Sequence, residues 1–190
     1  GAGHSSPLLG QAVTVRGVVT ALRPTGFWLQ DPQPDNNAAT AEALYVRTGQ
    51  PPFVGVGDDV RAAGSVAELP PSPGALPVTT LDGVTVTRLG VTTLPPATVL
   101  GQGGRMLPDR VLENDALQVF DPWEDGLDFW ESLEGMRGTV PNAVVVGPSD
   151  PAHGNRFWAL VDDEADAGPR APRGVLLESA ADANPERIEV

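Results

Sequence analysis

One short segment occurs twice in the chain, and it constrains the fold more than any other feature. Gly26-Phe27-Trp28-Leu29-Gln30-Asp31 returns as Arg156-Phe157-Trp158-Ala159-Leu160-Val161-Asp162. A Leu-x-Gly segment and a Val-rich segment precede each copy, and an acidic loop containing proline follows it. The repeat predicts two related β-rich units in series.

The first copy reads as a series of short strands. Val13, Val15 and Val19 alternate with more polar neighbours, which predicts a strand with one buried face. Pro24-Thr25-Gly26 is a turn signal, so residues 27–30 should return beside that strand as a hairpin. Further strands are expected at residues 43–48, at residues 60–69 with a bend or bulge at Gly64, and at residues 76–80 and 84–89, which a hairpin turn at Asp82-Gly83 would join.

Five short strands without a crossover helix predict a small closed barrel of the oligonucleotide/oligosaccharide-binding (OB) type. The alternative is an immunoglobulin-like sandwich, which needs about seven strands. Asp121-Pro122 begins a predicted helix that Gly135 ends, and its aromatic residues either plug one end of a barrel or form a stacking platform. The predicted class is mainly β, with two OB-like barrels in tandem and one short helix between or capping them.

The predicted domains follow from the repeat. Residues 1–98 form the first OB-like barrel, and residues 99–120 are a connector rich in Pro and Gly. Residues 121–190 form the second barrel, with strands expected at residues 143–146, 174–177 and from Ile188 onward. No second copy of Val56-Gly57-Asp58 is present, so either this barrel is incomplete or the connector adds a strand. We expect the sequence to be a piece of a longer protein.

Charge and composition exclude several kinds of function. The net charge is −13, and residues 101–190 contribute −11 of it from seven Arg against 18 Asp and Glu. Such a surface repels nucleic acid at long range, so any binding needs a local patch, bound cations or a neighbouring domain. The absence of Cys excludes disulfides and cysteine nucleophiles. No run of about 18 apolar residues is present, so no membrane helix is expected.

The loop after the first Phe-Trp segment is a candidate calcium site. Residues 31–42 carry several oxygen ligands close together, as a hard cation requires, and the residues chosen as ligands are Asp31, Asp35, Asn37 and Glu42. Prolines interrupt the spacing of a helix-loop-helix calcium loop, and acidic turns also form for backbone reasons alone. A second acidic loop, residues 162–166, is a weaker candidate.

The strand face that carries Trp28 and Tyr45 is the candidate ligand site. Exposed aromatic residues with Arg nearby bind single strands by stacking on the bases. Arg16 and Arg47 are the basic residues assigned to this face, and Arg23 lies close in sequence. The competing interpretation is that Trp28 only covers the barrel surface or packs on the second unit.

No catalytic motif is present in the sequence. His4 and His153 are the two histidines, and neither has an evident acid-base partner. A nucleophile elbow, a phosphate-binding glycine loop and a His/Glu metal pattern are all missing. We therefore assign no catalytic residue to this chain.

Several segments together resemble a known protein family. They are Gly10-x-x-Val13-x-Val15-x-Gly17-Val18-Val19-Thr20, Phe27-Trp28-Leu29-Gln30-Asp31-Pro32, Val56-Gly57-Asp58-x-Val60, Asp128-Phe129-Trp130-Glu131-Ser132-Leu133-Glu134-Gly135-Met136 and Asn184-Pro185-Glu186-Arg187-Ile188. They resemble the accessory region of large secreted or surface bacterial nucleases, which precedes a catalytic domain of the endonuclease/exonuclease/phosphatase superfamily. The superfamily's catalytic motifs have no counterpart here.

The resemblance implies a non-catalytic accessory module of an extracellular or cell-surface nuclease that uses Mg²⁺ or Ca²⁺. Its partners would be its own C-terminal catalytic domain and DNA or RNA, with no membrane. The module would position the catalytic domain or present nucleic acid to it. The alternatives are a surface-adhesion or carbohydrate-binding module that uses Trp28 or Trp123, and a self-contained hydrolase.

Overall fold

The computed structural model describes residues 3–154, 156–161, 179, 182 and 184–190. The chain forms two compact units, and each is described by itself. The first unit contains Gly1–Ala97 together with Glu131–Arg137, and the second contains Thr98–Trp130 and Gly138–Val190. Residues 131–137 therefore interrupt the second unit in sequence and fold with the first. We call Glu131–Arg137 the strap.

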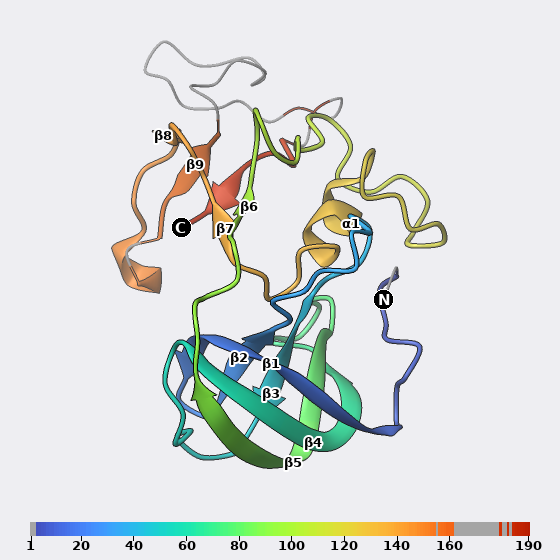
Figure 1. Cartoon of the computed structure of the whole chain (residues 1–190). Helices are drawn as coiled ribbons and strands as arrows, with labels where there is room; N and C mark the ends of the chain where they lie inside the picture. The colour runs from blue at the N-terminus through green and yellow to red at the C-terminus, as the bar shows by residue number, and fades with distance from the viewer. Residues whose placement is uncertain (1–2, 155, 162–178, 180–181, 183) are drawn as a thin grey trace. The chain divides into compact units, whose positions relative to one another are not determined.

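Five strands of the first unit close into a barrel. They are β1 (Ala12–Arg23), β2 (Gly26–Gln30), β3 (Ala43–Arg47), β4 (Asp58–Leu69) and β5 (Val78–Val91), in the order β1-β2-β3-β5-β4 (Figure 1). Strand β1 also pairs with β4, which closes the barrel, and β3 with β5 is the one parallel pair among these strands. A five-stranded barrel with this crossover agrees with the OB-type expectation. The mainly β class with one short α-helix is confirmed.

The barrel core follows from the alternation of side chains along each strand. Phe27 and Leu29 of β2 point inward and are almost fully buried, whereas Trp28 between them is only partly buried. They join a cluster of apolar residues from the other strands and from the loop before β4: Val19, Val46, Val54, Val60, Ala62, Val66 and Leu81. Burial of side chains of this size contributes about 1.5–3 kcal/mol each, so this cluster is the main source of stability in the first unit.

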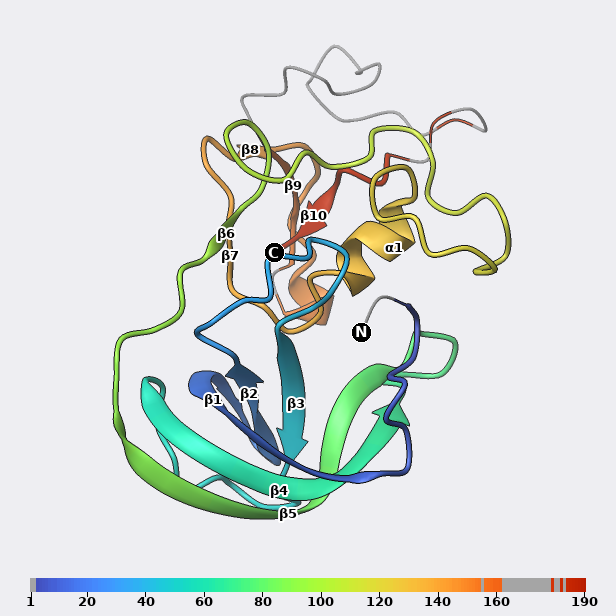
Figure 2. The same cartoon turned by 45° about the vertical axis from the view of Figure 1, so that its right-hand side comes forward.

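Two glycines shape the long strands. The register between β4 and β5 shifts between Ala63 and Ser65, which confirms the bulge expected at Gly64. A Cβ at Gly64 would lie 2.6 Å from the carbonyl oxygen of Asp82, so only glycine allows this approach. The hairpin turn predicted at Asp82-Gly83 is wrong. Gly83 has φ of +61° within β5, and the strand continues past it without reversing. Strand β5 is curved along its length (Figure 2).

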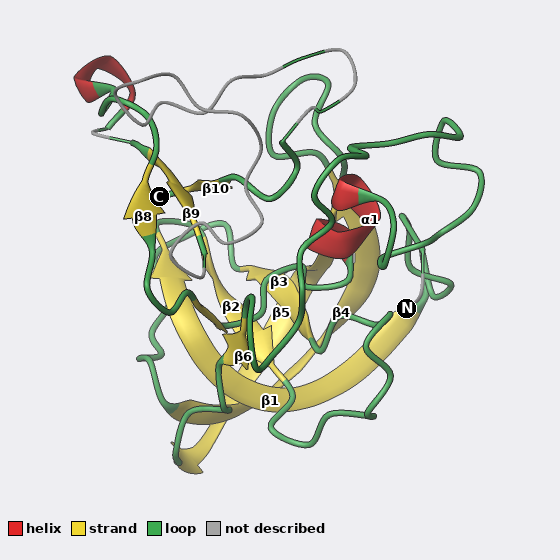
Figure 3. Cartoon of the chain, turned by 90° about the horizontal axis from the view of Figure 1, so that it is seen from above, coloured by secondary structure: helices red, strands yellow, loops and turns green. Residues whose placement is uncertain are grey.

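The second unit has short elements joined by long loops (Figure 3). Strands β8 (Val144–Val145), β9 (Trp158–Leu160) and β10 (Ile188–Glu189) form a three-stranded sheet in the order β10-β9-β8. Strands β6 (Thr98–Val99) and β7 (Gly138–Thr139) pair in parallel. A 3₁₀ helix covers Pro151–His153, and the strand expected at residues 174–177 lies outside the described residues. Closure of a second barrel stays a prediction.

The predicted helix begins later and ends earlier than expected. Helix α1 covers Gly126–Glu131, and Asp121 accepts a hydrogen bond from the backbone of Trp123 in the turn before it. Residues 106–119 belong to the connector, which was one of two alternatives for a missing strand, and their β-structure is an isolated bridge between Val111 and Asp125. Among the described residues, no helix has the length and apolar character that a membrane crossing requires.

The repeated segment takes the same local position in both units. Phe27-Trp28 lies on the second strand of the β1–β2 hairpin, and Trp158 lies on β9, which pairs antiparallel with β8. The burial differs, because Phe27 is fully buried in the barrel core whereas Phe157 is only half-buried. The repeat therefore preserves a strand pairing, while the packing around it has diverged.

Candidate functional site: a pocket on the first barrel

A pocket of about 550 Å³ lies on the β2–β3–β5 side of the barrel. Three of the four residues predicted for ligand binding meet there, namely Trp28, Tyr45 and Arg47. The sequence did not single out the rest of the wall, which includes Thr80 and the Pro70-Pro71 segment. These come from β5 and from the loop after β4, and no local sequence signal connects them to β2.

Strand register brings the two aromatic residues together. Trp28 and Tyr45 are direct partners in the antiparallel β2–β3 pair, and their ring centroids are 5.3 Å apart with an interplanar angle of 61°. Edge-to-face contacts of this kind add about 0.5–1.5 kcal/mol beyond burial. Gly26 allows the close approach, since a Cβ there would lie 2.5 Å from the Tyr45 hydroxyl oxygen. The pair forms a preorganised aromatic wall.

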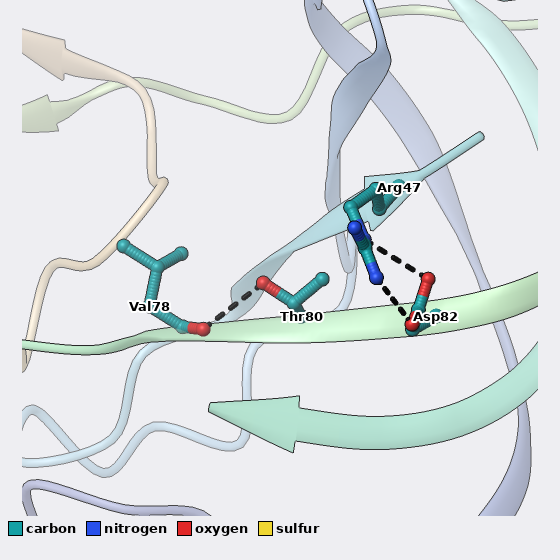
Figure 4. A network of polar contacts seen from close by, with 4 residues as sticks. All are labelled: Arg47, Val78, Thr80 and Asp82. Carbon is teal, nitrogen blue, oxygen red and sulfur yellow. Dashed lines mark hydrogen bonds and ion pairs between the residues drawn. The ribbon is translucent and has the colours of Figure 1, made fainter. Parts of the chain in front are cut away.

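Arg47 is held by a carboxylate rather than left free. Its Nε and Nη2 donate to the two oxygens of Asp82 at 3.0 and 2.5 Å (Figure 4). The hydrogen bonds and charge of Arg47 lower the pKa of Asp82. Nearby on β5, the Thr80 hydroxyl donates to the Val78 carbonyl at 3.0 Å. Asp82 therefore neutralises the guanidinium that was predicted to attract a ligand.

Arg16 lies apart from the aromatic pair, contrary to its assignment to the same ligand face. Its Nε and Nη2 donate to the carboxylate of Asp59 at 3.0 and 2.6 Å, which lowers the pKa of Asp59. Both residues line a different pocket of about 470 Å³, together with Asp31. The reason is the strand pairing. Arg16 lies in the part of β1 that pairs with β4, whereas Trp28 pairs with Tyr45 of β3, which pairs in turn with β5.

Arg23 is the basic residue that remains available in the aromatic pocket. It lies at the end of β1, is exposed, and has no ion pair within the described part of the chain. Together, the 1–97 and 131–137 segments hold six Arg and nine Asp or Glu, a net charge of −3. The remaining −10 of the chain's −13 belongs to the second unit. An anionic ligand is therefore repelled least at the first unit.

The candidate calcium loop is organised by its own hydrogen bonds. Asp35 Oδ1 accepts from the Asn37 backbone at 2.7 Å, and the Thr40 hydroxyl donates to the Asp35 carboxylate at 3.0 Å. Glu42 accepts from the Asp35 backbone at 2.9 Å, and Asp31 accepts from the Gln33 backbone at 2.8 Å. The backbone bonds lower the pKa of Asp35, whereas burial raises that of Glu42.

Because these hydrogen bonds stabilise the turns of the loop, turn formation by itself accounts for the acidic composition. Within the described residues, no three His, Cys, Asp or Glu side chains gather as a metal requires, so calcium binding here stays a prediction. The second acidic loop, residues 162–166, lies outside the described residues.

The strap lies against the same side of the barrel. A Cβ at Gly135 would lie 2.3 Å from Cε3 of Trp28, so the indole ring rests directly on the strap backbone. Gln30 Oε1 accepts from the Arg137 backbone at 3.0 Å, and the Arg137 guanidinium donates to the Pro95 carbonyl. Glu134 Oε1 accepts from the Thr79 backbone at 2.9 Å. Trp28 is therefore fixed by a segment more than a hundred residues away in sequence.

The aromatic residues of the second unit do not form a shared platform. Trp123 is 66% exposed, whereas Phe129 is buried beneath the guanidinium of Arg105, which lies 4.9 Å from its ring centroid. Trp130 donates through Nε1 to the Pro185 carbonyl at 3.4 Å. Arg187 covers the Trp158 ring at 5.1 Å. These rings mainly contribute to packing. Trp123 is the exposed aromatic residue of α1 and the turn before it.

Comparison with protein families identifies the family to which this chain belongs. The model of a family described as "Domain of unknown function (DUF8508)" matches residues 89–190, slightly more than half of the chain. The chain belongs to the DUF8508 family. No curated protein and no solved structure matches it. The DUF8508 match begins at Leu89 in β5, covers the whole second unit, and includes the strap that folds with the first unit. Membership brings no activity with it, so function rests on the geometry.

Proposed function

We propose that this chain is a non-catalytic accessory module of an extracellular nuclease, and that its first barrel presents a short single-stranded segment of nucleic acid. The pocket carries the proposal, because it places the Trp28–Tyr45 wall beside the guanidinium of Arg23, which has no ion pair within the described residues. An aromatic wall stacks on bases, and one guanidinium binds one phosphate. The resemblance to accessory regions of secreted nucleases supports a catalytic domain as its partner.

The charge of the chain limits how strongly the pocket would bind. Asp82 and Asp59 neutralise Arg47 and Arg16, so few phosphates would be contacted. Each phosphate contact on a single strand contributes about 0.7 to the slope of log affinity against log salt. We therefore expect weak binding that is detectable only at low salt, suited to positioning a strand for a linked domain.

A carbohydrate ligand is the second candidate, and the same aromatic pair favours it. Trp28, Tyr45 and the Pro70-Pro71 segment form a wall with little charge, which suits a neutral sugar ring. Salt distinguishes the two ligands, because stacking on a neutral sugar does not release counterions. Fluorescence anisotropy with labelled oligo(dT) and with a labelled polysaccharide fragment, over a range of salt, tests both. Salt-insensitive binding of the sugar with no binding of oligo(dT) would replace the nucleic-acid proposal.

A further inference from the structure

The strap carries a half-buried acid that the proposed function does not use. Glu134 contacts the barrel at Thr79: its Oε1 accepts a hydrogen bond from the backbone N–H of Thr79 at 2.9 Å. The hydroxyl of the same Thr79 donates to Glu68 Oε1 at 3.2 Å. One residue of β5 therefore joins two carboxyl groups, one from the strap and one from β4.

The surroundings of Glu134 disfavour its charged form. Among the described residues, Glu131 and Glu68 are the charged groups that face it, and both are acidic. Glu68 Oε2 is itself buried with no hydrogen-bond partner in the described part of the chain. Burial first, and then the charge of Glu131, raise the pKa of Glu134 to about 8, although the Thr79 N–H acts in the opposite direction.

The strap makes further contacts with the barrel. Gly135 rests on Trp28, while Arg137 bonds to Gln30 and Pro95 through its backbone and guanidinium. The contact with the Glu68–Thr79 pair places an ionisable carboxyl group of the strap against the barrel. A change at Glu134 therefore acts next to the residue that holds the indole ring of the pocket.

We propose that the strap is a pH-responsive latch on the barrel, closed over Trp28 when Glu134 is protonated and released when Glu134 ionises. In the docked strap Glu134 keeps its proton to a higher pH, whereas in the free strap Glu134 loses it at the ordinary glutamate pKa. Docking is therefore strongest below about pH 4.5 and weakens as pH rises to about 8. The latch does not depend on the pocket having a nucleic-acid ligand.

The test is an NMR titration of the whole chain from about pH 5 to about pH 9. The Glu134 carboxyl carbon, the Thr79 amide and the Gly135 Hα resonances should titrate together with a midpoint near pH 8. Gly135 Hα should also lose its ring-current shift from Trp28. Amide hydrogen exchange at Arg137, whose N–H donates to Gln30 Oε1, should lose protection over the same range after correction for the intrinsic rate.

E134Q keeps the oxygen that accepts from Thr79 and removes the charge. Its strap should stay protected at all pH values, while E124Q, in an exposed glutamate outside the strap, should behave as the parent. A Glu134 midpoint near the ordinary glutamate value would overturn the proposal. Titration of Glu134 without loss of protection at the Arg137 amide would overturn it equally. If E134Q fails to fold, the Glu134 and Gly135 signals of the parent protein decide alone.

Discussion

The indole ring of Trp28 rests on the backbone of Gly135, with room for no side chain at position 135. A Cβ there would lie 2.3 Å from Cε3 and 2.4 Å from Cζ3 of Trp28, and Gly135 has φ of +68°. Gly135→Ala should therefore destabilise the first unit by about 2–4 kcal/mol, through the left-handed backbone and the clash together. Urea unfolding followed by circular dichroism measures this loss.

Gly74→Ala is the matched control for that substitution. Gly74 has φ of +82°, and a Cβ added there would meet no heavy atom within 4 Å, so this variant measures the cost of the left-handed backbone alone. We expect about 1–2 kcal/mol for it. Equal losses for the two variants would mean that Trp28 is free to move away from the strap.

Asp82 restrains the second guanidinium of the pocket, so its removal should strengthen the binding of an anionic ligand. Asp82→Asn leaves Arg47 without its counter-charge beside Trp28 and Tyr45. We expect tighter oligo(dT) binding and a salt slope steeper by about 0.7, which is one additional phosphate contact. Anisotropy titrations at several salt concentrations measure both quantities.

Asp59→Asn makes the same charge change away from the aromatic pocket, because its partner Arg16 lines the other one. Its effect on oligo(dT) affinity should be smaller than that of Asp82→Asn, and it should come from long-range charge alone. If Asp59→Asn strengthens binding as much as Asp82→Asn, the ligand is responding to net charge and not to the pocket.

The stability of the first unit should depend on pH in two opposite ways. Arg88, Arg16 and Arg47 lower the pKa values of their partners Asp58, Asp59 and Asp82, so these pairs stabilise above the ordinary aspartate pKa and lose that effect as pH falls below it. Glu134 acts in the opposite direction. Its raised pKa stabilises the fold below about pH 4.5, and this contribution is lost as pH rises to about 8.

Thermal unfolding from about pH 4 to about pH 9 tests this balance. Glu134→Gln should reduce the loss of stability that the parent shows as pH rises from about 4.5 to about 8. We expect a reduction on the order of 2 kcal/mol, since partial exposure of the side chain weakens the full effect of the pKa shift. A parent protein whose melting temperature is constant between pH 5 and pH 8 would contradict the burial of this carboxyl group.

Calcium should bind the loop of residues 31–42 only weakly. To coordinate an ion, Asp35 must give up its bonds from Asn37 and Thr40, and Glu42 must give up its bond from the Asp35 backbone. We expect dissociation constants in the millimolar range, as in weak extracellular sites. Isothermal titration with calcium, compared between the parent and Asp35→Asn, measures this. Micromolar binding would show that the loop rearranges around the ion.

Local sequence patterns predicted the strands of the first barrel well, because alternation and turn residues act over a few positions. Val19, Phe27 and Leu29 are buried as their period of two requires. The Asp82-Gly83 prediction failed because a left-handed glycine is compatible with both a hairpin turn and a continuous strand. Only the pairing of β5 with two other strands decides between them.

The candidate site was predicted only in part. The β2–β3 register explains why Trp28 and Tyr45 meet, as expected from their assignment to one strand face. The carboxylates that neutralise Arg16 and Arg47 lie 43 and 35 residues away, where no local pattern reaches. The strap was equally hidden, because Glu134-Gly135 has the composition of a helix end.

The claim that the aromatic pocket presents nucleic acid is tested most directly by one pair of variants. Arg23→Ala removes the exposed guanidinium of Arg23 from the pocket, and Arg61→Ala makes the same charge change at an exposed position of β4 that does not line it. Anisotropy with labelled oligo(dT) at low salt should show weaker binding and a salt slope lower by about 0.7 for Arg23→Ala, with Arg61→Ala close to the parent. Equal binding by all three proteins, or no binding by the parent, would contradict the account.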